Sequence, residues 1–160
     1  MSHGSHTTKD HGNIHYLHLL MMSVLSFFSM YALMYAMVDS FSNVYFNLNQ
    51  FYMAGLMTAP MILIEILVMK STYQNKKLNS FVIAGGIVAL IGFFTLIREQ
   101  TAISDKQFLK SMIPHHGGAI LMCQKASIEN PEIKDLCQAI ISSQQQEINE
   151  MKAKLAELEK

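Results

Sequence analysis

The sequence predicts an all-α protein in which three membrane-spanning helices precede a C-terminal helical hairpin. Hydrophobic residues make up 51% of the 160 residues and charged residues only 15%, which is too apolar for an ordinary soluble domain. Nearly all of the charge lies before residue 11 or after residue 69. We therefore expect the middle of the chain to lie in a membrane and both ends to face water.

The N-terminal residues 1–15 form a histidine-rich segment. No small-residue cleavage site follows the first apolar run, so we expect that run to be a retained anchor and not a signal peptide. The formal net charge is zero, which gives no electrostatic reason to expect nucleic acid as a partner. The lipid bilayer is the partner that the composition predicts.

Three apolar segments, at about 16–38, 51–69 and 81–97, match or approach the length of about 17 to 25 residues that a spanning helix needs. They make residues 16–98 the predicted anchor. The linker Asp39–Gln50 has no Lys or Arg, whereas the linker Lys70–Ser80 carries three lysines. By the positive-inside rule, we expect the N-terminus and the second linker in the cytoplasm and the tail in the periplasm or outside the cell.

The tail, residues 104–160, is predicted to form two helices, at about 105–128 and 131–158. Ser104 with Gln107 suits a capping box at the start of the first helix. Pro131 fits the first turn of the second, where its missing N–H costs nothing. Apolar and neutral residues recur in the second helix at alternating steps of four and three, which predicts a heptad seam made of Cys137, Ile141, Gln144, Ile148, Met151, Leu155 and Leu158.

A hairpin of two such helices leaves one side of each apolar stripe exposed to solvent. The chain contains no internal repeat that would complete a bundle. We therefore expect the tails to self-associate, so that two hairpins form a four-helix bundle in a homo-oligomer.

The strongest chemical signal is the run MIPHHGGA that begins at Met112. The glycines and alanine of this run leave room beside the histidines. Six side chains of this helix fall within an arc of roughly 120° on one face: Met112, His115, His116, Ala119, Met122 and Cys123.

Folding the hairpin about Asn130 places Cys123 level with Cys137 and His116 level with Gln144. The histidines then face Gln144, Glu147 and, one turn further, Met151. Imidazole nitrogens and thioether sulfurs form a borderline-to-soft site, which favours copper, and Cu(I) in preference to Cu(II). Taken alone, each methionine is more often flexible core filler, but burying two adjacent imidazoles without partners costs a few kcal/mol.

Three roles remain open for Cys123 and Cys137. Helix axes pack about 8 to 10 Å apart, so a disulfide forms only where the helices pinch together, as they do near a tight turn. A reduced pair would add two soft metal ligands, and an inert core pair is the third alternative. Gln144 and Glu147 are further candidate ligands.

The stretch Asp105–Leu155 carries MIPHH at 112–116, a methionine seven residues after His115, and QQQEINEM at 144–151. In these motifs the tail resembles the bacterial family known as domain of unknown function 305 (DUF305). The resemblance implies a ferritin-like four-helix bundle and copper binding through Met and His, in a bacterial inner-membrane protein, because the anchor also resembles that of membrane-bound members. Carried over residue by residue, it implies the metal ligands Met112, His115, His116, Met122 and Met151.

A second, weaker candidate site lies at the N-terminus. Four residues there occur at steps of four, three and four on one helical face. Antiparallel packing would bring them near Glu65, an ionisable residue inside a span and therefore a functional hypothesis by default. The simpler alternative is that Glu65 snorkels to the interface or pairs with His18 or a lysine. The candidate ligands of this site are His11, His15, His18, Met22 and Glu65.

The sequence thus predicts a membrane-anchored protein that sequesters or buffers copper on the extracytoplasmic side, without catalytic turnover. An adaptor that binds a partner helix through the heptad seam is the main alternative. A redox enzyme is a weaker one, because the chain lacks the multiple Glu and Glu-x-x-His ligands of di-iron bundles.

Overall fold

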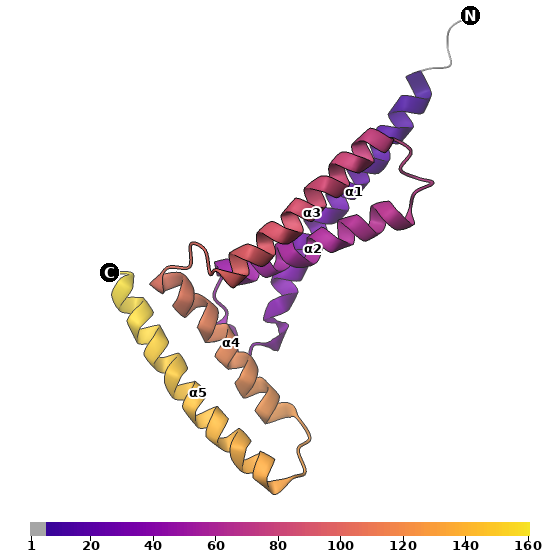
Figure 1. Cartoon of the computed structure of the whole chain (residues 1–160). Coiled ribbons are helices and arrows are strands. Elements are labelled where there is room, and N and C mark those ends of the chain that lie inside the picture. The colour runs from indigo at the N-terminus through magenta and orange to yellow at the C-terminus, as the bar shows by residue number, and fades with distance from the viewer. Residues whose placement is uncertain (1–5) are drawn as a thin grey trace, which may run out of the picture. The chain divides into compact units, whose positions relative to one another are not determined.

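A computed structural model describes residues 6–160, with side chains described from Ile14 onward. Within this range every regular element is helical and no strand occurs, so the predicted all-α class is confirmed. In chain order the elements are α1 (His6–Leu33), the 3₁₀ turns η1 (Met34–Met37) and η2 (Phe41–Asn43), α2 (Leu48–Val68), α3 (Lys76–Arg98), α4 (Asp105–Lys125) and α5 (Pro131–Leu158) (Figure 1).

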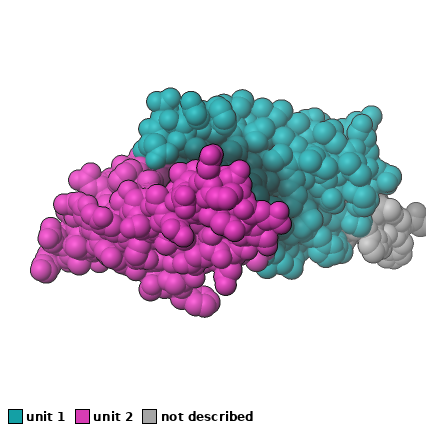
Figure 2. Space-filling view, turned by 90° about the horizontal axis from the view of Figure 1, so that it is seen from below, with its two compact units in different colours: residues 1–31, 51–101 teal, residues 32–50, 102–160 magenta. Residues whose placement is uncertain are grey.

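The chain divides into two compact units, which Figure 2 colours separately. Unit 1 contains the chain up to Tyr31 together with Phe51–Thr101, and unit 2 contains Ala32–Gln50 together with Ala102–Lys160. The sequence boundaries assign residues 32–50 to the anchor, whereas in the structure these residues pack with the tail.

Three segments are long and apolar enough to cross a membrane: Ile14–Met37, Leu48–Val68 and Lys76–Arg98. They coincide with the predicted spans, which are confirmed by length and composition. Only 6% of the most apolar window of Lys76–Arg98 is buried within the protein. Such an apolar surface, left open along a whole helix, is stable in lipid and not in water.

Small residues set the spacing of α2 and α3 in unit 1. A Cβ on Gly55 would collide with the ring of Phe93, and a Cβ on Gly86 would lie 2.7 Å from Cδ2 of Leu63. Small residues at such positions allow close approach between membrane helices, where van der Waals packing drives association.

In unit 2, α4 and α5 form the predicted hairpin (Figure 1). The first helix ends at Lys125, three residues before the predicted end, and Ala126 after it is already extended, with ψ 137°. The side chain of Asn130 caps α5 by accepting from the N–H groups of Glu132 and Ile133, and Pro131 occupies the first turn as predicted.

The predicted capping box at Ser104 is wrong. Ser104 precedes α4, but its side chain makes no capping hydrogen bond. Gln107, the other half of the motif, instead accepts from the backbone N–H of Leu48 at 2.9 Å. Leu48 begins α2, so Gln107 satisfies an unpaired donor at the start of a different helix.

The heptad seam of α5 packs against α4 within one chain. Ile148 is fully buried, Met151 and Leu155 are nearly so, and all three belong to one core cluster with Leu109 and Ile113 of α4. Leu158, at the end of the seam, stays 43% exposed. The four-helix bundle and the self-association of the tails remain predictions.

The segment before α2 covers another face of α4. This segment packs on α4 at two glycines. A Cβ on Gly117 would collide with the carboxylate of Asp39. A Cβ on Gly118 would lie 3.5 Å from the carbonyl oxygen of Met37. From the sequence, these glycines are expected to leave room beside the histidines; in the structure the segment before α2 occupies the room over Gly117 and Gly118.

Candidate metal centre

His116 is the buried histidine of the tail. It lies in the middle of α4, is 7% exposed, and is held at both ring nitrogens. Its Nδ1 lies 2.9 Å from the carbonyl oxygen of Met112, one turn earlier, and its Nε2 lies 2.6 Å from Oε2 of Glu147 on α5. The predicted convergence of His116 and Glu147 across the hairpin is thus present.

The two partners of His116 fix the protons of its ring. A backbone carbonyl only accepts, so Nδ1 carries a proton and donates it to Met112. Nε2 then faces the carboxylate of Glu147 at 2.6 Å, so the two groups share a proton in this hydrogen bond. The Nδ1–H···O=C contact is also the arrangement that orients a metal-binding histidine and leaves Nε2 as the coordinating atom.

Two methionines lie one helical turn away from this pair. Met112 precedes His116 by four residues on α4, and Met151 follows Glu147 by four residues on α5. Met151 is 9% exposed and belongs to the core cluster against which Met112 packs. Because the hairpin is antiparallel, both methionines lie on the same side of the His116–Glu147 pair, one helical turn from it towards the start of α4. We call these four residues the inner set.

The other two predicted ligands of the tail lie outside the inner set. His115 is exposed, with its ring centroid 6.1 Å from that of His116, and Met122 is 52% exposed. His115 and Met122 therefore lie on the exposed side of the helical face that the sequence predicted. Gln144 is half-buried on the seam of α5, and no hydrogen bond joins it to His116.

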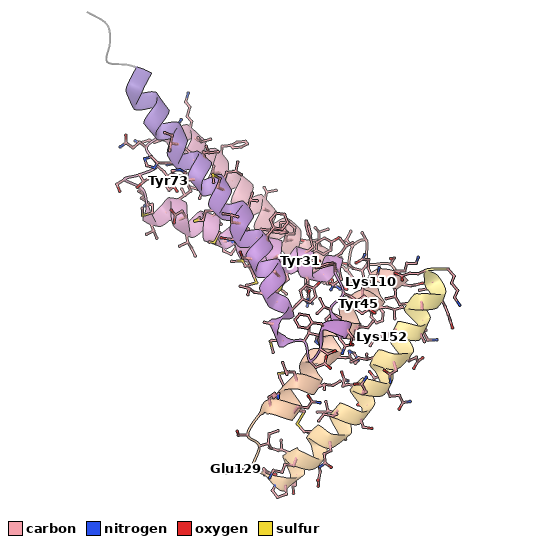
Figure 3. All side chains as sticks on the ribbon, turned by 180° about the vertical axis from the view of Figure 1, so that it is seen from behind. Tyr31, Tyr45, Tyr73, Lys110, Glu129 and Lys152 are labelled. Atoms are coloured by element: carbon pink, nitrogen blue, oxygen red, sulfur yellow. A yellow bond between two sulfur atoms is a disulfide. The ribbon has the colours of Figure 1, made fainter. Side chains whose placement is uncertain are left out.

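Cys123 and Cys137 form a disulfide with a Cα–Cα distance of 5.2 Å. Of the three roles left open by the sequence, the structure has the disulfide, so in this oxidised form the two sulfurs do not act as thiolate ligands. The bridge closes the turn end of the hairpin, marked by Glu129 in Figure 3. Near the other end, Lys110 forms a 3.0 Å salt bridge with Glu159, and the two links fix the register of α4 on α5.

Among the residues that the structure describes, no three His, Cys, Asp or Glu side chains gather where they could hold a metal ion. The inner set contributes only one histidine and one carboxylate of these types. A metal ion held in this hairpin therefore needs the methionine thioethers, or donors from a second chain, to complete its coordination.

The second candidate site of the sequence is only partly within the described side chains. The side chain of His11 lies outside them, and His15 and His18 are exposed. Met22 packs against a small cluster formed by Leu19, Ile66 and Tyr73. Of the described side chains, neither His15 nor His18 forms an ion pair with Glu65.

Glu65 has a different partner from those the sequence suggested. The hydroxyl of Tyr73 donates to its Oε1 at 3.2 Å, and neither His18 nor a lysine forms an ion pair with it in the described chain. Burial raises the pKa of Tyr73 above its ordinary value, and the nearby charge of Glu65 raises it further. Tyr73 therefore stays protonated and continues to donate at alkaline pH.

Sequence reasoning missed Asn47, which joins the start of α2 to α4. Its Nδ2 donates to the carbonyl of Lys110 at 3.3 Å, and its Oδ1 accepts from the N–H of Gln50 at 2.9 Å. Pro114 has no N–H to offer the carbonyl of Lys110, four residues earlier, so Asn47 supplies the missing donor. The internal proline signals that such a donor is needed, but only the tertiary structure identifies it.

The comparisons with known proteins agree with the features of the tail. A family model described as "Domain of unknown function (DUF305)" matches residues 94–155, which include the end of α3 and most of the hairpin. The "Uncharacterized protein L153" of Acanthamoeba polyphaga mimivirus is 39% identical over 142 residues, which cover 87% of this chain and 91% of the viral protein. No solved structure matches. This relative comes from a virus and gives no support to the expected bacterial setting.

Proposed function

The chain belongs to the DUF305 family, and from this premise we propose that it is a membrane-anchored protein that sequesters copper, as Cu(I), at its tail hairpin. The observation that carries the proposal is the position of His116. This imidazole is buried and oriented by a backbone carbonyl at Nδ1, and its Nε2 points at Glu147. Met112 and Met151 both lie one helical turn from this pair, on the same side of it.

The donor types of the inner set suit the proposed cargo. Thioether sulfur and imidazole nitrogen favour Cu(I), whereas magnesium and calcium prefer several oxygen ligands. The inner set offers two sulfurs and one nitrogen but only one carboxylate. A thioether also stays unprotonated in acidic surroundings, so these sulfurs remain available as donors where a thiol would not.

Each residue of the inner set has a distinct part in binding. Nδ1–H of His116 stays hydrogen-bonded to Met112 and keeps the ring in place. The Nε2 proton must leave before that nitrogen coordinates a metal, and the carboxylate of Glu147, 2.6 Å away, is the adjacent acceptor. Copper would then replace the proton shared by the two side chains. The side chain of His116 is buried, whereas that of Glu147 is 51% exposed, so the site is open to water on the carboxylate side.

The proposed location is a membrane, with the tail on its extracytoplasmic side. The three apolar helices support the anchoring. The lysines of the linker between α2 and α3 support the orientation by the positive-inside rule, and the disulfide supports an oxidising compartment for the tail.

The proposal is tested by anaerobic Cu(I) titration of the full chain in detergent, against a competing chelator. We expect His116→Ala to abolish stoichiometric binding and Met151→Leu to weaken it at least tenfold, because each removes a donor of the inner set. His115→Ala is the matched control: it deletes the neighbouring, exposed imidazole, and binding should stay within about twofold of the original chain.

Equal binding by all variants would remove the inner set as the site. Binding lost with His115→Ala and retained with His116→Ala would place copper on the exposed face instead. If no variant binds and the unsubstituted chain does not bind either while its tails self-associate, the adaptor function is favoured. Circular dichroism of each variant checks that the hairpin is still folded.

A further inference from the structure

A second feature with binding chemistry lies in unit 1, where α2 ends and α3 begins. A pocket of about 560 Å³ opens between these two helices and their linker, beside Tyr73, which Figure 3 labels. All of its lining residues belong to unit 1. None of them takes part in the copper site proposed above.

The mouth of this pocket is cationic. Lys70 and Lys76 both line it, and Lys77 follows directly in the sequence. None of the three forms an ion pair within the described chain, where the salt bridges are made by Lys110, His116 and Lys154. Ser80 also lines the pocket, but its hydroxyl donates to the carbonyl oxygen of Lys76 at 3.0 Å. Unpaired ammonium groups around a concave site favour an anion.

The wall of the pocket is apolar. Ile66, Leu67 and Ile83 line it together with the lysines. Leu67 is 53% exposed, and the adjoining Val68 and Phe81 are 73% and 76% exposed. The apolar wall is therefore continuous with the outer surface of α2 and α3, which is the surface expected to contact acyl chains.

Glu65 is the acidic group nearest to these lysines on α2. It does not line the pocket, and its carboxylate accepts from the hydroxyl of Tyr73. It therefore faces a neutral donor inside the unit, and the lysines at the mouth keep an excess of positive charge.

We propose that this pocket binds an anionic phospholipid, with the headgroup phosphate between Lys70 and Lys76 and an acyl chain along Ile66, Leu67 and Ile83. A free phosphate would use the lysines but not the apolar wall, whereas a lipid matches both halves of the lining. Basic pockets between membrane helices hold anionic headgroups in this way. The inference rests on the proposed membrane anchoring and is independent of copper.

The test is native mass spectrometry of the full chain, released from micelles that contain equal amounts of phosphatidylglycerol and phosphatidylcholine. We expect preferential retention of phosphatidylglycerol. The variant Lys70→Gln/Lys76→Gln should lower that preference by about fivefold for each lysine removed. Lys125→Gln/Lys134→Gln, which removes the same charge from exposed positions of the tail, should leave the preference unchanged.

Equal loss of preference in both double variants would show a general charge effect and overturn the pocket. Displacement of phosphatidylglycerol by millimolar inorganic phosphate would identify a free-phosphate site instead. Flotation of the chain with pure phosphatidylcholine vesicles separates the two proposals. If both double variants float and show the same lipid preference as the original chain, the pocket is wrong and the anchoring stands; if the original chain does not float, the anchoring itself is wrong.

Discussion

At the scale of single residues, the tail depends on a few close contacts made by individual side chains. His116 is positioned by the backbone of its own helix and by one carboxylate from the next. Asp39 lies over Gly117 and accepts from Asn43, whose side chain is 3% exposed and whose Oδ1 has no partner in the described chain. At Gly117 in particular, a larger side chain would displace the carboxylate of Asp39.

Gly117→Ala should destabilise the chain by about 1–2 kcal/mol. The new methyl group collides with the carboxylate of Asp39, which must turn away and abandon the buried Asn43, and the loss exceeds the gain of about 1 kcal/mol in helix propensity. Urea denaturation of the full chain in micelles, followed by circular dichroism, measures the difference.

Gly118→Ala is the matched control for that substitution. A Cβ there lies at an ordinary 3.5 Å from the carbonyl oxygen of Met37, so the gain in propensity should dominate and the chain should be unchanged or slightly more stable. Equal stability changes in the two variants would mean that Asp39 does not pack on Gly117.

At the scale of helices, the termini decide how the tail is joined to the segment before α2. The first N–H groups of a helix have no partner within it. At α5, Asn130 satisfies two of them locally, whereas at α2 the donors are satisfied by Asn47 and by Gln107 of α4. The start of α2 is therefore tied to α4 by side chains, and both ties lie within unit 2.

Asn130→Ala should lower the free energy of unfolding by about 1 kcal/mol, because it removes a cap that accepts from Glu132 and Ile133. Ser104→Ala should change it by less than about 0.5 kcal/mol, since the serine side chain makes no capping bond at α4. Urea titration of the two variants in parallel checks both values. A larger loss for Ser104→Ala than for Asn130→Ala would restore the capping box.

At the scale of the whole molecule, orientation in the membrane depends on charge and on redox chemistry. By the positive-inside rule, the lysines of the α2–α3 linker favour the cytoplasmic side for that linker, and the proposed orientation puts the tail on the opposite side. The disulfide of the tail is stable outside the reducing cytosol. Charge and disulfide lie in different parts of the chain and support the same orientation.

This orientation predicts the state of the thiols in cells. The chain has two cysteines, so a maleimide–polyethylene glycol reagent should add no mass to the denatured protein before reduction and two labels after it. The variant Cys123→Ser should accept one label without any reductant. Two labels on the unsubstituted chain before reduction would place the tail in a reducing compartment and overturn the proposed orientation.

The sequence alone determined the all-α class, the three apolar spans and the two tail helices, because hydrophobic length and helical periodicity are local properties of the chain. It also predicted the antiparallel pairing of the tail helices from the short turn, with Cys123 level with Cys137, and the disulfide joins these two residues. His116, predicted to lie level with Gln144, bonds instead to Glu147, which the sequence places on the same face of α5.

Only the tertiary structure decided which predicted ligands share a site. His116 is buried against α5, whereas the adjacent His115 is exposed. The sequence placed both residues on one helical face of roughly 120°, and a face that wide does not distinguish the buried residue from the exposed one. The packing of residues 32–50 on α4 likewise depends on contacts far apart in sequence: Asp39 over Gly117, and Asn47 on the carbonyl that Pro114 leaves unpaired. Such contacts depend on the complementary shapes and hydrogen-bonding groups of two distant segments, which neither segment specifies alone.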